Sequence, residues 1–287
     1  MPIEPPTPMA AAFVGHGSPM NAIEDNRFTK TWATLGASLA RPRAILVISA
    51  HWYIDRTAVT SMVNPRTVHD FGGFPQQLFD VRYPVPGDPE LAGEIVDLLK
   101  PTAVELDSQG WGLDHGTWSV LVHAFPRADV PVLQLSINAG QPFDWHFALG
   151  AKLAPLRKRN ILILGSGNVV HNLRAMDLSK PDVGFDWARR FDSDVRAILT
   201  NHPADIVAIR RHPDFQRAQP TPDHFMPLLY VAGLADAEER PLEVLADGFS
   251  YGAISMTCYG LDVPNLGVAR PAPASHRDAD AGPATLS

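Results

Sequence analysis

Cysteine is nearly absent from this sequence: Cys258 is the only one among 287 residues. An intrachain disulfide and a zinc site built from cysteine thiolates are therefore excluded. Runs of lysine and arginine are also missing, and 24 basic against 31 acidic residues give a formal net charge of −7. Because nucleic-acid binding needs a clustered positive surface, we expect no nucleic-acid partner.

Long hydrophobic runs and targeting signals are lacking as well. No stretch approaches the roughly 18–20 apolar residues of a membrane span. The opening residues MPIEPPTPMAAAF contain no basic segment followed by an apolar one, so no secretory signal is visible. We expect no membrane partner, and the simplest hypothesis is a cytoplasmic protein.

The composition is that of a folded domain. Hydrophobic residues make up 45% of the chain and charged residues 19%, which allows a substantial buried core. Residues 1–9 are rich in proline and residues 264–287 in proline and alanine, so we expect a flexible N-terminus and a disordered tail. No linker or repeat interrupts residues 10–263, so we predict that they form a single domain.

Short apolar segments alternate with amphipathic ones along the chain. The strand candidates are Ala10–Gly15, Ala44–Ala50, Val130–Ile137 and Asn160–Gly165, with Thr57–Val63 and Ala253–Tyr259 expected nearer a sheet edge. Helical spacing is found in Phe28–Leu39, Pro89–Leu99, Thr117–Phe125, Asp144–Leu156 and Phe185–Leu199. This alternation predicts the α/β class, with a mostly parallel central sheet and helices on both faces.

Three of the eleven histidines follow apolar strand candidates: His16 ends AAFVGH, His51 ends AILVISAH, and His171 follows ILILGSGNVV. Open α/β sheets bind ligands beyond the carboxyl ends of their strands, so these side chains can converge. Imidazole there can bind a divalent metal or transfer protons near neutral pH. The alternative is that each is an ordinary strand-end histidine hydrogen-bonded to the backbone. This alternative is less convincing for three histidines that all occupy the same position relative to a strand.

Two further histidines lie in unusual local settings. In GWGLDHGTWSV, Asp114 precedes His115 at the start of a helix and can cap that helix and orient the imidazole. In QPTPDHFMPLL, His224 follows Asp223, which we interpret as a helix N-cap rather than a ligand. His69 lies in a Gly/Phe/Pro loop that could flank a pocket. Surface or core positions are expected for the others: His123, His146, His202, His212 and His276.

Several other chemistries find no support. GSGNVV lacks the third glycine of a dinucleotide fingerprint, and neither a G-x-x-x-x-G-K-[ST] phosphate loop nor an HExxH helix occurs. Ser166 in LGSGN does not form the G-x-S-x-G nucleophile elbow. Cys258 lies in an apolar strand candidate and is expected to be a buried, inert thiol.

Six segments in one order, from Gly15 to about Gly233, resemble a known family: GHGSPMN, SAHWY, HDFGGFPQ, GLDHGTWSVL, GSGNVVHNL and TPDHFMPLLYVAG. They make the sequence similar to the DODA-type class III extradiol ring-cleavage dioxygenases of the LigB superfamily, in particular to its bacterial 4,5-DOPA-extradiol-dioxygenase group. The resemblance implies a LigB-like fold, with residues 10–263 as the catalytic domain.

The resemblance also implies a role for each matching histidine. His16, His51 and His224 correspond to metal ligands, although Asp223 beside His224 leaves the third ligand open. His171 corresponds to the acid/base residue and can also touch the metal in zinc-loaded forms. His115 corresponds to a residue near substrate. Trp52, Phe71, Phe74 and Trp118 are candidates for apolar walls of the pocket, with core packing as the alternative.

The expected activity is insertion of O2 into a catechol ring, DOPA or another catechol, to give a ring-opened semialdehyde. Fe(II) is the expected working metal, and Zn(II) can occupy the site in purified protein because histidine-rich sites bind zinc readily. Two alternatives stay open: a zinc-dependent hydrolase on the same histidines, and a non-catalytic binding protein. The sequence shows neither the particular catechol, the side of cleavage, nor the oligomeric state, and no Arg/Lys cluster marks a site for a substrate carboxylate.

Overall fold

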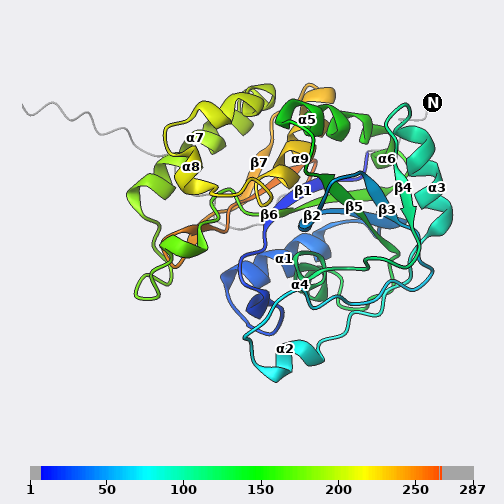
Figure 1. Cartoon of the computed structure of the whole chain (residues 1–287), viewed down its shortest axis with the longest axis horizontal. Helices are drawn as coiled ribbons and strands as arrows, with labels where there is room; N and C mark the ends of the chain where they lie inside the picture. The colour runs from blue at the N-terminus through cyan, green and yellow to red at the C-terminus, as the bar shows by residue number, and fades with distance from the viewer. Residues whose placement is uncertain (1–7, 265, 267–287) are drawn as a thin grey trace, which may run out of the picture.

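The computed structural model describes residues 8–264 and 266. Within them, an eight-stranded sheet lies between two layers of helices (Figure 1). The strands stand in the order β4-β3-β5-β2-β6-β1-β10-β7. Their bounds are β1 Ala11–Gly15, β2 Ala44–Ile54, β3 Ala58–Thr60, β4 Glu105–Asp107, β5 Val132–Asn138, β6 Ile161–Gly167, β7 Glu243–Ala246 and β10 Cys258–Leu261, and a separate hairpin is formed by β8 Phe249–Ser250 and β9 Ile254–Ser255.

The helices follow the strands in the alternation that the sequence predicted. The α-helices are α1 Arg27–Ser38, α2 Gln76–Asp80, α3 Pro89–Leu98, α4 His115–Ala124, α5 Phe143–Lys152, α6 Ala154–Arg157, α7 Asp186–Leu199, α8 Phe215–Ala218 and α9 Met226–Ala237, and the 3-10 helices are η1 Pro19–Ala22, η2 Leu173–Ala175 and η3 Pro203–Arg211. No helix in the described part of the chain is long and apolar enough to cross a membrane.

The four central strands are parallel, and the antiparallel pairings lie toward the edges. β1 and β2 both run parallel to β6, and β2 runs parallel to β5. β10 pairs antiparallel with β1, and β3 pairs antiparallel with β5. The sheet is therefore mixed around a parallel centre, which confirms the predicted α/β class. Because the central strands are parallel, their carboxyl ends meet at one edge.

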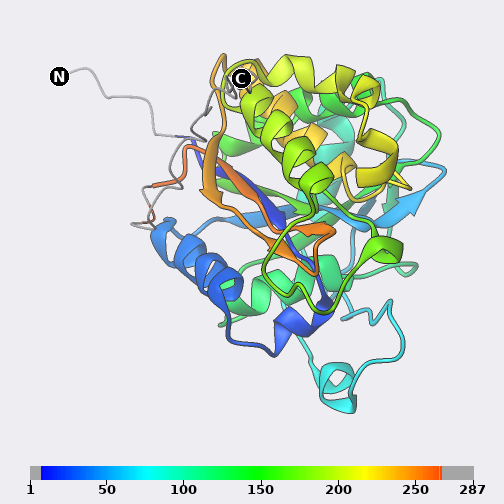
Figure 2. The ribbon, with the colours of Figure 1, turned by 90° about the vertical axis from the view of Figure 1, so that its left-hand side faces the viewer.

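Both faces of the sheet are buried because alternate side chains pack against different helix layers. From β2, Leu46 and Ile48 pack toward α5, α7 and α9, while Val47 packs toward α1 and α4. Figure 2 shows the same sheet with α1 and α4 on one side and α7 and α9 on the other. The nearly continuous apolar runs of these strands are explained by this burial on both faces.

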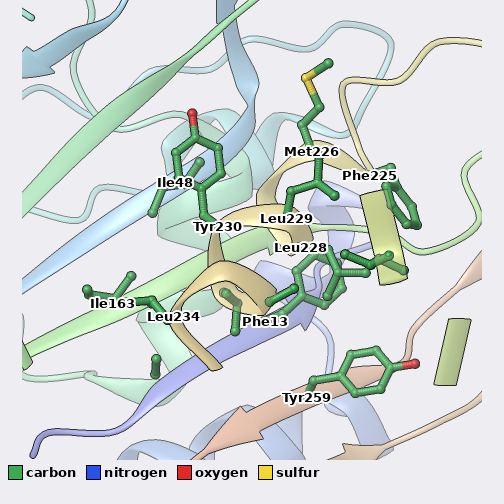
Figure 3. Close-up of a cluster of buried hydrophobic side chains, with 14 of the residues drawn as sticks. Phe13, Ile48, Ile163, Phe225, Met226, Leu228, Leu229, Tyr230, Leu234 and Tyr259 are labelled. Carbon is green, nitrogen blue, oxygen red and sulfur yellow. The ribbon is translucent and has the colours of Figure 1, made fainter. Parts of the chain in front are cut away.

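Helix α9 is the main helix that is missing from the segments predicted by helical spacing. Its residues from Met226 to Ala235 are all buried, with Leu228, Leu229 and Tyr230 fully so. In the close-up of Figure 3, α9 lies against β1, β2 and β6, near Phe13 and Ile163. A helix covered on every side has no polar face, so the amphipathic period by which a surface helix is predicted is missing.

Two other boundaries differ from the predictions for local reasons. The helix expected over 144–156 is divided at Leu153 into α5 and α6, where Pro155 lacks the amide hydrogen needed to continue. The strand expected over 253–259 is divided into β9 and β10. Met9, in the segment expected to be flexible, is buried and its amide donates to Arg157 O.

Candidate metal centre

Five histidines from distant parts of the sequence line one cavity at the carboxyl edge of the central strands: His16, His51, His115, His171 and His224. His16 directly follows β1, and His171 follows β6 by four residues. His115 is the first residue of α4, and His224 lies shortly before α9. The five side chains therefore converge on one cavity, as we expected for histidines at the ends of neighbouring strands.

His51 differs from its predicted position because β2 continues past it to Ile54. The regular pairing of β2 with β6 ends at Ser49, and its pairing with β5 shifts register between Ile48 and Tyr53. His51 therefore lies in an irregular stretch of the strand, where its side chain can reach the cavity.

The imidazole nitrogens come close together at the centre of the cluster. His51 Nε2 lies 3.1 Å from His16 Nε2, and nitrogens of His16, His51 and His115 lie within 4.8 Å of one another. The ring of His224 approaches the same pair, with centroids 5.4 Å from His16 and 5.0 Å from His51. His171 stacks on His224 at a centroid distance of 3.4 Å. Three or four imidazoles can therefore bind one divalent cation, which fits a metal site.

Hydrogen bonds from the opposite ring nitrogens orient these imidazoles. His16 Nδ1 lies 3.0 Å from Ser166 Oγ, whose hydroxyl donates to the carbonyl oxygen of Gly116. The hydroxyl hydrogen is thereby used, so Ser166 accepts from His16 Nδ1–H. His16 then presents a bare Nε2 to the cluster, which is the form that binds a metal. Ser166, rejected as a nucleophile, is a positioning residue.

Asp70 orients two histidines at once and is a residue that the sequence interpretation missed. Its Oδ2 lies 3.0 Å from His115 Nδ1 and 3.2 Å from His51 Nδ1. Its Oδ1 accepts from the backbone amide of His115 at 2.9 Å. The prediction that Asp114 orients the His115 imidazole is wrong. Asp114 caps α4 by accepting from Thr117 N, and it also binds the Ser49 hydroxyl.

Asp223 likewise orients a histidine, and the prediction that it caps a helix is wrong. Its Oδ2 accepts from His224 Nδ1 at 2.5 Å, whereas the N-cap position of α9 is Phe225, with no side-chain cap. His224 Nε2 is left for the cluster. In the described structure Asp223 therefore positions a candidate ligand.

The electrostatics keep His16, His51 and His171 neutral and Asp70 ionised. Burial, reinforced by the neighbouring histidines, lowers the pKa of His16, His51 and His171 well below its usual value of about 6.5. Burial alone would raise the pKa of Asp70, but the hydrogen bond from His115 and the charges of His115 and His51 outweigh it and lower the pKa to about 2. Neutral imidazoles are the metal-binding form.

The cavity in front of the histidines has a volume of about 830 Å³. Phe71 and Phe74 line it, as expected for apolar walls. Trp52 and Trp118 do not: Trp52 stacks on Trp111 at 6.0 Å, and Trp118 is fully buried and donates to the carbonyl of Val68. Core packing is therefore the correct interpretation of both tryptophans.

The remaining histidines have ordinary structural partners or lie elsewhere. His69 is bonded to the carbonyl of Val81 and is not part of the cavity wall. His123 is bonded to the carbonyl of Asn21, and His212 pairs with Asp194. His202 precedes η3, and His276 is outside the described residues. Cys258 is buried, which raises the pKa of its thiol to about 11 and fits an inert side chain.

Comparison with known proteins identifies the family. Residues 8–262 match the family model described as the catalytic LigB subunit of aromatic ring-opening dioxygenases. The chain belongs to the LigB family. A LigB relative from Escherichia coli K12, named 4,5-DOPA dioxygenase extradiol, is 48% identical over 87% of this chain and 93% of its own length. The protein of the same name from Beta vulgaris is 38% identical over 86% of this chain and 94% of its own.

A solved LigB-like structure agrees with these sequence matches. The crystal structure of an uncharacterised Escherichia coli K12 protein superimposes with a TM-score of 0.77 and 42% identity, covering 88% of this chain and 99% of that one. The protein is accordingly a metal-dependent extradiol dioxygenase of the LigB family, acting on an aromatic substrate with O2.

Proposed function

We propose that this LigB enzyme opens the ring of a catechol with a DOPA-like side chain, using Fe(II) and O2, to give a semialdehyde. One observation carries the proposal. The imidazoles of His16, His51 and His224 each have Nδ1 beside a hydroxyl or carboxylate acceptor, which leaves Nε2 for a shared metal in a cavity of about 830 Å³.

His16, His51 and His224 are the proposed metal ligands. The closest mutual approach of nitrogens is in the set His16, His51 and His115, so His115 is the competing third donor. His224 is favoured because its Nδ1 has a carboxylate acceptor of its own, Asp223, whereas His115 shares the acceptor Asp70 with His51. When bound, iron supplies the one-electron chemistry that lets O2 react with the catechol ring, which zinc cannot supply.

His171 is the proposed acid/base residue. Its imidazole makes no hydrogen bond to another residue in the described part of the chain, so both ring nitrogens are available to a ligand in the cavity. Because burial lowers its pKa, the ring is neutral at pH 7 and can accept a catechol hydroxyl proton. His115, held by Asp70, presents Nε2 to a substrate oxygen. Phe71 and Phe74 exclude water from the ring side.

The test is reconstitution of metal-free protein with Fe(II) or Zn(II) under nitrogen, followed by a catechol panel that includes DOPA and then by oxygen. We expect O2 uptake and a yellow product with iron only. His171→Ala should keep the metal and lose at least about 100-fold in kcat, the usual contribution of a general base. Ester or amide hydrolysis with zinc, or no turnover with any metal, would contradict the proposal.

A further inference from the structure

A guanidinium group lines the active cavity beside the histidines. Of the described residues that form the cavity wall, Arg27 is the only lysine or arginine. It is the first residue of α1, and the wall continues from it through Asn26 and Asn21 to His16. The same cavity therefore joins the metal centre to a fixed positive charge that the metal chemistry leaves unused.

The guanidinium of Arg27 is confined without being neutralised. Its Cζ lies 4.5 Å from the ring centroid of Phe28. On another side it approaches Gly248 so closely that a Cβ there would lie 2.2 Å from Nη2. Within the described part of the chain, no carboxylate forms an ion pair with it. An arginine held by ring and backbone contacts alone keeps its five donors for a ligand.

The other charges of the cavity wall are negative. Glu24 and Asp182 line it, and neither forms an ion pair with a described residue. Among the described side chains of the wall, these two carboxylates repel an anionic group that enters the cavity, and the Arg27 guanidinium attracts it. When the ring diol occupies the metal centre, Arg27 is therefore the charged side chain of the described wall that can bind a substrate carboxylate.

We propose that Arg27 binds the carboxylate on the side chain of the catechol substrate. The inference rests on the proposed ring-opening function and adds a specificity-determining residue to it: Arg27 is assigned to the carboxylate of the DOPA-like side chain. The planar guanidinium fork can bind both carboxylate oxygens, while the ring diol lies at the histidines. This supplies the carboxylate contact that the sequence motifs left open.

The experiment compares a matched pair of substrates, dihydroxyphenylpropionate and the uncharged propylcatechol, with the iron-loaded enzyme. Arg27→Gln should lower the ratio of kcat/KM for the acid over the uncharged compound by about 10-fold, the loss of one charge-assisted contact at a partly exposed site. Arg27→Lys should give an intermediate ratio, because charge remains without the fork. Added salt should reduce the ratio in the unchanged protein.

Arg210→Gln is the matched control. Arg210 also lies over a phenylalanine ring, that of Phe143 at 5.4 Å, but outside the cavity, so the ratio should not change. An unchanged ratio in Arg27→Gln, or an equal loss for both compounds, would overturn the subsite. Binding of both compounds, measured without oxygen, separates the two proposals. If the enzyme turns over no catechol but Arg27→Gln still lowers the affinity for the acid relative to the uncharged compound, the ring-opening function fails and the carboxylate subsite stands.

Discussion

At the scale of single residues, four imidazoles of the metal centre are oriented by three acceptors: Ser166 for His16, Asp70 for His51 and His115, and Asp223 for His224. The five histidines were predicted because each lies in a distinctive local motif, but Asp70 is 45 residues from His115, and Ser166 is 150 residues from His16. Such pairs form only when the fold brings them together. Asp114, a neighbour in sequence, was the wrong choice because a helix N-cap turns its carboxylate toward backbone amides.

Asp70→Asn should weaken metal binding. The side-chain amide has one acceptor oxygen, whereas Asp70 accepts from the amide of His115 and from two imidazoles. We expect the metal dissociation constant to rise by about 10- to 100-fold, as for other residues that orient metal-binding histidines. Competition with a chromophoric chelator measures this directly.

Asp80→Asn is the control for that measurement, since Asp80 is exposed at the end of α2 and binds only Gln76 in the described structure. Equal metal affinity in the Asp70 variant and the control would show that Asp70 does not position His51 for the metal.

Titration of His146 should make the free energy of unfolding decrease as the pH falls below about 6.5. It is buried between Tyr230 OH and the carbonyl of Asn138, and burial lowers its pKa to about 4. The unfolded chain binds the proton near pH 6.5, so the stability contributed by neutral His146 is present above that pH and is lost as pH falls toward 4.

His146→Gln removes this titration. The variant should be less stable at pH 7, and the gap in free energy of unfolding should narrow below pH 6.5 by up to about 1.4 kcal/mol per pH unit. Urea denaturation of both proteins between pH 7 and 5 measures the gap. A gap that stays constant over this range would mean that burial does not depress the pKa of His146.

At the scale of elements, the sequence predicted the strands and helices whose apolar residues form a recognisable pattern. It gave no bounds for helix α9, which has no such pattern. Strands β1, β2, β5 and β6 were found within a few residues, as were α1, α3 and α7. α9 was indicated only by the helix N-cap expected at Asp223 and was given no bounds, because a helix buried all round shows no amphipathic period. This helix matters for function because it begins two residues after His224 and packs along its whole length in the core against the sheet.

Two glycines allow the close packing of α9 on α5. A Cβ on Gly233 would lie 2.0 Å from the carbonyl oxygen of Phe147, and one on Gly150 would lie 2.3 Å from that of Tyr230. Gly233→Ala should therefore lower the free energy of unfolding by about 1–3 kcal/mol, the cost of overpacking against backbone.

Gly93→Ala is the matched substitution, because Gly93 lies within α3 with nothing within 4 Å of the added methyl group. It should raise stability by about 0.5–1 kcal/mol, since alanine has the higher helix propensity. Chemical denaturation of both variants provides the comparison. A destabilised Gly93 variant, or a stable Gly233 variant, would contradict the packing argument.

At the scale of the whole molecule, the α/β class and the edge that holds the site followed from sequence alone. Parallel neighbouring strands have their carboxyl ends at the same edge of the sheet, whatever the length of the connections between them. The antiparallel pairings of β3 with β5 and of β10 with β1 did not follow, because β3 and β10 are three- and four-residue strands whose partners are distant in sequence.

Metal removal should lower the stability of the whole domain without unfolding it. The buried core on both faces of the sheet does not involve the histidines, so the fold should persist. A metal present at about 1,000 times its dissociation constant adds about 4 kcal/mol to the free energy of unfolding. Thermal unfolding with and without chelator should show a lower Tm and unchanged far-UV circular dichroism. An identical Tm would mean that no metal binds the native state.

The scattering of the five histidines over the chain has a consequence for biosynthesis. Positions 16 and 224 mark the ends of the set, and β1, which leads into His16, is enclosed between β6 and β10. A nascent chain on the ribosome cannot assemble the centre until the chain has emerged as far as His224 and the strand β10 that encloses β1. Cleavage of the chain at any loop between residues 16 and 224 leaves some of the histidines on each of two fragments. Activity of such a cleaved enzyme would then show that the two fragments are associated.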